Sequence, residues 1–256
     1  MGGKKETLES RWAKVCGRLV HYRASVDSPG EKGAPVVLVH GLGVSSRYMI
    51  PTAARLAPHR RVYAPDLPGF GRSEKPARAL NLAELSDALR GWMDEVGIAR
   101  AVLLGNSIGC QVVVELALTR PQLVERMVLV SPTVDRGART VFRSFARLLV
   151  DIPRERLSLP FIALLDYLQA GLGRTAHTFG YAMQDRVEEK LPRALQPALV
   201  VRGGRDPVVS AAWAAEVSRL LPAGRLIVLD GAPHAVNHHS PEQLAALVLS
   251  FMQDKI

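Results

Sequence analysis

Residues 101–119 read AVLLGNSIGCQVVVELALT, and they join two structural patterns across one short turn. The run AVLLGN is typical of a strand buried on both faces, and the residues after Ser107 fit an apolar helix. Between them, residues 105–109 match G-x-S-x-G. A sharp strand-to-helix turn crowds the two flanking glycines together and projects the serine hydroxyl outward. We therefore predict that Ser107 is a nucleophile, the alternative being a glycine-rich turn whose serine only caps the helix.

Five further apolar runs resemble this strand, and amphipathic helical patterns alternate with them. Alternation of this kind predicts an α/β fold with a mostly parallel sheet and helices on both faces. The segment from Val15 to Val26 predicts an antiparallel strand pair before this sheet. The five runs are PVVLVHG (35–41), RVYAPD (61–66), RMVLVSP (126–132), ALVVRGG (198–204) and RLIVLDG (225–231).

One stretch interrupts the alternation. About sixty residues between Pro132 and Ala198 carry helical patterns and no strand pattern. We expect a helical cap inserted after the sixth strand, at the sheet edge where loops of α/β proteins carry function. The predicted division is a first core part at 1–134, the cap at 135–195 and a second core part at 196–256.

With the turn around Ser107 in this context, the sequence resembles the α/β-hydrolase superfamily over nearly its whole length. The motif HGLG at 40–43 is similar to that family's oxyanion loop, which implies that the backbone N–H groups of Leu42 and Ile108 hold an oxyanion. We interpret His40 as a structural support of this loop. The motif DLPGFGRS at 66–73 is also frequent in the family, and we interpret it as a structural turn.

A serine nucleophile needs a base, and the base needs an orienting carboxylate. The resemblance implies the chain order Ser, acid, His, and Asp206 and His234 each follow a predicted strand in that order. Asp135 and Asp230 are weaker candidates for the acid. His238 and His239 are weaker candidates for the base, because they precede Ser240 and are expected at a solvated helix start.

The composition excludes several classes of protein. A net charge of +9 invites a nucleic-acid interpretation, but the sequence contains no recognisable binding module. Two cysteines are too few for a disulfide framework, the N-terminus lacks a secretory apolar segment, and the apolar runs are short. We therefore expect a cytoplasmic protein without stable membrane insertion. We also expect no metal and no cofactor, because no zinc pattern, strand-linked G-x-G-x-x-G or Walker A motif is present.

The predicted cap offers two features for the substrate. Apolar side chains at helical spacing are candidates for the pocket lining, although packing of the cap helices on the core is the simpler interpretation of each. The candidate binding residues are Phe142, Phe145, Phe161, Leu165 and, outside the cap, Val208. Arg139, Arg143 and Arg147 recur every four residues and share one helix face. This face is interpreted as solvated, as a weak surface for anionic lipid, or as a rim that attracts acidic substrates.

These residues predict a serine esterase that acts on small or medium-sized carboxylic esters. Asn106 before the nucleophile also resembles hydrolases that cleave C–C bonds in vinylogous diketones, but Ala235, Val236 and Asn237 stand where those usually carry Trp. A lactonase or thioesterase would use the same residues. A non-catalytic ligand receptor on the same fold is the alternative from another class. The oligomeric state and the natural substrate are left open.

Overall fold

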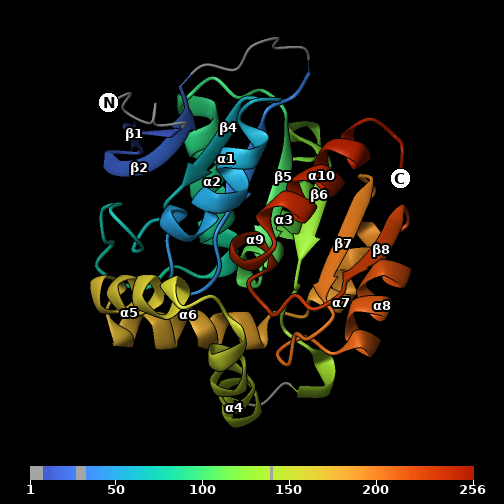
Figure 1. Cartoon of the computed structure of the whole chain (residues 1–256). Helices are drawn as coiled ribbons and strands as arrows, with labels where there is room; N and C mark the ends of the chain where they lie inside the picture. The colour runs from blue at the N-terminus through green and yellow to red at the C-terminus, as the bar shows by residue number, and fades with distance from the viewer. Residues whose placement is uncertain (1–7, 27–32, 139–140) are drawn as a thin grey trace, which may run out of the picture.

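A computed structural model describes residues 8–26, 33–138 and 141–256, the side chains of 138–145 excepted. Its centre is an eight-stranded sheet in the order β1-β2-β4-β3-β5-β6-β7-β8 (Figure 1). β1 and β2 are antiparallel to their neighbours, and the other strands run parallel. The predicted α/β class and mostly parallel sheet are confirmed. The strands are β1 (Leu8–Val15), β2 (Arg18–Ser25), β3 (Val36–Val39), β4 (Val62–Pro65), β5 (Ala101–Asn106), β6 (Val124–Val130), β7 (Ala198–Gly203) and β8 (Gly224–Leu229).

The central strands are buried on both faces, as their uninterrupted apolar runs predict. In β5, Leu103 belongs to the core on one side of the sheet, and its neighbours Val102 and Leu104 belong to the core on the other side. This alternation follows from the two-residue period of a strand, and it leaves no face for water.

Helices cover both faces of the sheet (Figure 1). One core includes buried residues of α2 (Leu82–Glu95), α3 (Ile108–Thr119) and α8 (Ala211–Leu220). The other includes α1 (Ile50–Leu56), α9 (Val236–His239) and α10 (Pro241–Met252). Asn81 and Glu84 form the capping box at the start of α2, with both of its hydrogen bonds present.

The described part of the segment between β6 and β7 contains helices joined by short loops and no strand. In Figure 1 its α5 and α6 lie side by side at one end of the sheet, with α4 beyond them. The elements are η3 (Arg136–Ala138), α4 (Val141–Asp151), η4 (Ile152–Arg154), α5 (Ser158–Ala170), α6 (Leu172–Gln184), α7 (Val187–Lys190) and η5 (Leu191–Arg193). We call α4 to α6 the cap helices below.

The first strand pair differs from the sequence expectation in its extent. β1 begins at Leu8, seven residues before the predicted start at Val15, and turns into β2 at Cys16 and Gly17. The alternation in β1 is hard to recognise because Arg11 and Trp12 are both exposed on a strand at the sheet edge.

Candidate active site

Ser107 stands on the turn between β5 and α3, where the sequence placed it. Its backbone has φ 55° and ψ −124°, a region that residues with a side chain rarely adopt. The surrounding structure holds this strain, because Ser107 N–H donates to Val130 O at 3.0 Å and Cys110 N–H donates to Ser107 O at 3.0 Å. The strained backbone leaves the hydroxyl at the surface of a pocket that Ser107 lines.

The two motif glycines are required by close backbone contacts. A Cβ on Gly105 would lie 2.6 Å from the carbonyl carbon of Gly109. A Cβ on Gly109 would lie 2.4 Å from Val39 O, in the strand beside β5. The steric reason predicted for G-x-S-x-G therefore holds on both sides of the serine.

The loop after β3 lies against the same serine. A Cβ on Gly41 would lie 3.3 Å from Ser107 Cβ, and Leu42 lines the pocket beside Ser107 and Ile108. Ile108 is the first residue of α3, so its N–H has no acceptor within the helix. The structure thus brings together the two residues predicted for the oxyanion hole.

His40 supports this loop from behind. It is buried, its Nδ1 lies 2.8 Å from Gly41 O, and its Nε2 accepts a hydrogen bond from Leu67 N–H at 2.9 Å. Burial lowers the pKa of His40. The bond from Leu67 N–H agrees with this direction, because Nε2 can accept it only when it carries no proton. The structural interpretation of His40 fits these contacts.

Asp206 and His234 lie in the loops after β7 and β8 and are in contact. His234 Nδ1 lies 3.0 Å from Asp206 Oδ2, and the other carboxylate oxygen accepts from Val208 N–H at 2.7 Å and Val209 N–H at 3.0 Å. Burial opposes ionisation of Asp206, but the charge and hydrogen bond of His234 and these backbone donors outweigh it, and its pKa is lowered. Asp206 is thus held as a carboxylate that orients His234.

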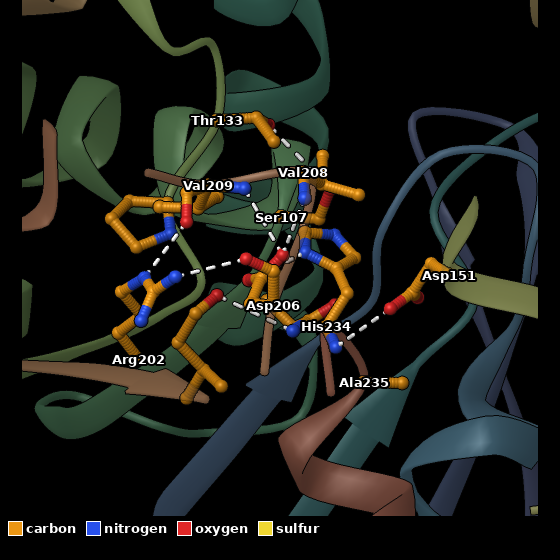
Figure 2. Close-up of polar contacts among 12 residues, drawn as sticks. Ser107, Thr133, Asp151, Arg202, Asp206, Val208, Val209, His234 and Ala235 are labelled. Atoms are coloured by element: carbon orange, nitrogen blue, oxygen red, sulfur yellow. Dashed lines mark hydrogen bonds and ion pairs between the residues drawn. The ribbon is translucent and has the colours of Figure 1, made fainter. Parts of the chain in front are cut away.

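His234 has a pKa well above that of an ordinary imidazole. Burial lowers this pKa, but Asp206, Asp151 and Glu155 together raise it to about 9. Figure 2 shows Ser107, Asp206 and His234 gathered at one place, with Asp151 on the other side of His234. Ser107 and His234 line the same pocket. Within the described chain Ser107 Oγ does not hydrogen-bond His234 and instead lies 3.5 Å from Thr133 Oγ1; such contacts often tighten only around a substrate.

The weaker candidates have other partners. Asp135 forms an ion pair with Arg147 at 2.9 Å and accepts from Ser210 N–H at 3.3 Å. Arg147 also donates to Val208 O at 3.1 Å, so this member of the predicted arginine face is half-buried rather than solvated. The side chains of Arg139 and Arg143 lie outside the described residues.

His238 is only 4% exposed, because α9 packs it against the core. The expected solvated helix start is therefore wrong for this residue.

Two carboxylates between β6 and β7 reach the histidine loop, and sequence reasoning missed both: Asp151 at the end of α4 and Glu155 in the loop before α5. Asp151 Oδ1 accepts from His234 N–H at 3.2 Å, and Glu155 Oε1 accepts from Ala235 N–H at 2.7 Å. Burial raises the pKa of Glu155, and the neighbouring Asp151 helps raise it to about 8. The sequence signal was weak: two acids four residues apart within an arginine-rich segment are more often solvated.

The pocket is lined mostly by apolar side chains, but from a different face of α5 than expected. Leu159, Ala163 and Tyr167 follow one another at four-residue spacing and line it. The prediction is wrong for Phe161 and Leu165, which are 72% and 56% exposed on the outer face. Phe142 and Phe145 have side chains outside the described residues, and Val208 lines the pocket.

Two further features of the described residues concern ligands and membranes. No group of three or more His, Cys, Asp or Glu side chains in this part of the chain could hold a metal ion. Within the same ranges, every helix is too short or too polar to cross a membrane.

The chain is similar to known proteins in sequence and in fold. A model of the alpha/beta hydrolase family matches residues 36–247. The chain is 30% identical over 261 residues to a dihydrolipoyllysine-residue acetyltransferase component of an acetoin cleaving system from Pseudomonas putida, covering 94% of this chain and 68% of the relative. It is 30% identical over 259 residues to a 2-hydroxymuconate semialdehyde hydrolase from the same species, covering 91% and 92%. Among solved structures, the enol-lactonase from Burkholderia xenovorans LB400 is similar with a TM-score of 0.78 and 25% identity, covering 95% of this chain and 100% of the other.

Proposed function

Because the chain belongs to the alpha/beta hydrolase family, we propose that it is a serine hydrolase that cleaves small or medium-sized carboxylic esters through Ser107, His234 and Asp206. The observation that carries this proposal is the strained backbone of Ser107 in one pocket with a histidine that a buried carboxylate orients.

The proposed reaction has two halves. His234 Nε2 takes the Ser107 proton as Oγ attacks the ester carbonyl, and the N–H groups of Leu42 and Ile108 stabilise the oxyanion. The leaving alcohol departs with the proton from His234, and the acyl group stays on Oγ. Water then gives a proton to His234 and attacks this acyl ester, and Ser107 leaves with the proton returned to it. Asp206 stays ionised throughout.

The pocket supports a compact acyl group. It encloses about 160 Å³. A cavity of about 150 Å³ holds one benzene molecule, so short or single-ring acyl groups match the space. The lining contains the carboxyl groups of Asp135, Asp151 and Glu155 and, within the described residues, no lysine or arginine. An acidic acyl group would find no lysine or arginine partner there, which favours neutral esters.

A C–C bond hydrolase or a lactonase is the second candidate, because the 2-hydroxymuconate semialdehyde hydrolase and the enol-lactonase each match nearly the whole chain. The proposed residues would serve either reaction. The residue pattern after His234 and the acidic lining favour the ester.

From Cys16 and Cys110, both free thiols, we also propose a cytoplasmic location.

A substrate panel distinguishes these activities. We expect hydrolysis of p-nitrophenyl acetate or benzoate at the highest kcat/KM, with lower values for lactones, thioesters and a dienoic diketone. Ser107→Ala is expected to abolish turnover of each. A preference for the diketone would replace the ester assignment, and turnover that survives in Ser107→Ala would refute the proposed nucleophile.

A further inference from the structure

The outer face of α5 is apolar and uncovered. Its exposed side chains besides Ser158 are apolar, with exposed fractions from 56% to 72%: Phe161, Leu164, Leu165 and Leu168. The exposure continues beyond both ends of the helix at Leu157, 86% exposed, and Leu172, 69% exposed. Exposed leucines are ordinary when scattered, but a continuous stripe on one helix indicates a surface that contacts a partner. We call the four α5 side chains the α5 stripe.

The inner face of the same helix fixes its orientation. The single charged residue of α5, Asp166, is fully buried and accepts a hydrogen bond from Ser45 Oγ at 2.6 Å. Tyr167 packs so closely on Gly43 that a Cβ there would lie 2.6 Å from its ring. Burying the stripe by rotating α5 would break these contacts and remove Tyr167 from the pocket.

Arginines flank the stripe along the chain. Between residues 151 and 178 the three carboxylates, Asp151, Glu155 and Asp166, are all buried. The arginines in the same stretch reach solvent: Arg156 is exposed, and Arg154 and Arg174 are half-buried. On a neighbouring segment, Lys75 contacts Gln169 O and stands next to the exposed Glu74, while Arg47 is paired with Asp166. Within residues 151–178, the charges that reach solvent on either side of the stripe are therefore basic.

We propose that the α5 stripe docks on an anionic lipid surface, with the flanking arginines against the headgroups. Apolar side chains with basic residues beside them are the composition of an interfacial helix. The 13 residues of α5 are about 20 Å long, shorter than the roughly 30 Å of a bilayer core, so the helix lies in the interface. A symmetric dimer through the same face would set these arginines against one another, which disfavours a second copy as the partner.

Docking at this place would bring the membrane next to the pocket. The stripe and the pocket lining are opposite faces of one helix, so the thickness of α5, about 10 Å, separates the docked face from the pocket. The docking surface does not depend on the proposed esterase activity, and its test does not use that activity as the readout.

Vesicle sedimentation tests the proposal with the full-length protein. We expect binding to vesicles of phosphatidylcholine with 30% phosphatidylglycerol, weak binding to phosphatidylcholine alone, and loss of binding as salt rises. Leu164→Ser with Leu168→Ser should weaken binding by at least about tenfold, because the docked face loses two large apolar side chains that docking would bury. Arg154→Gln with Arg156→Gln should weaken it by about fivefold per arginine at low salt.

Leu19→Ser with Leu195→Ser is the matched control, since both leucines are exposed outside the cap helices. We expect this variant to bind vesicles as the wild type does, and circular dichroism checks that each variant is folded. Wild-type protein that stays in the supernatant with every vesicle would overturn the proposal. A dimer in light scattering that Leu164→Ser with Leu168→Ser dissociates would also overturn it and assign the stripe to a second copy.

Discussion

His234 determines the pH range in which this site can work. As a general base it must be unprotonated, and its pKa is raised to about 9 by Asp206 and by the cap carboxylates. At pH 7 most His234 side chains are then protonated, so only a small fraction of the protein molecules has an active base. The kcat/KM for a neutral ester should therefore rise with pH and level off above about 9. A plateau already reached at pH 7 would contradict the raised pKa.

Asp151→Asn separates the contribution of the cap to this pKa. The amide oxygen can still accept from His234 N–H, but the negative charge is lost, so the pKa of His234 should fall. We expect the acidic limb of the kcat/KM profile to move to lower pH while Ser107 stays reactive. Asp87→Asn, on the exposed face of α2, is the control and should leave the limb unchanged.

Gly109 carries an element-scale prediction, because it sets how closely α3 approaches β3. Gly109→Ala would place a Cβ 2.4 Å from Val39 O, and the helix would have to move. We expect a loss of about 1–3 kcal/mol in the free energy of unfolding, measured with urea. Gly180→Ala in α6 is the matched control: open space surrounds it, and a gain of about 0.5–1 kcal/mol is expected. Equal effects of the two substitutions would refute the close approach.

The strands, the turn at Ser107 and the helix α5 differ in how much of their structure the sequence predicts. Uninterrupted apolar runs determine the strands, and the steric demand of G-x-S-x-G determines the turn at Ser107. The orientation of α5 could not be predicted, because a helix that is apolar on all sides carries no periodic signal for its buried face. For this reason the sequence predicts Phe161 and Leu165 on the pocket face, whereas both lie on the outer face. The contacts of Asp151 and Glu155 with the histidine loop could not be predicted, because their partners lie 83 and 80 residues away along the chain.

At the scale of the whole molecule, Asp66 joins β2, the loop after β3 and its own turn after β4. Its carboxylate contacts His21 Nδ1 at 2.8 Å and accepts from Ser46 N–H at 2.6 Å and Arg72 N–H at 2.9 Å. Burial opposes its ionisation, but these partners outweigh burial and lower the pKa of Asp66 to about 2. The motif DLPGFGRS is thus a structural turn organised around its first residue.

The lowered pKa makes this contribution depend on pH. Because the folded pKa lies below the unfolded one, the stabilisation is complete above about pH 4 and is lost as pH falls through about 2. Its size is about 2 kcal/mol, from the shift of the pKa. The difference in unfolding free energy between wild type and Asp66→Asn should therefore shrink between pH 7 and pH 2.5. A difference that stays constant with pH would contradict this role.

The central claim, that Ser107 is the activated nucleophile of this pocket, can be measured without knowing the substrate. Folded protein is treated with a fluorophosphonate, and the adduct is located by mass spectrometry of the intact chain and its peptides. We expect one adduct, on Ser107, that forms more slowly in His234→Ala and is absent from Ser107→Ala. No adduct on folded wild-type protein, or an adduct at another residue, would contradict the account.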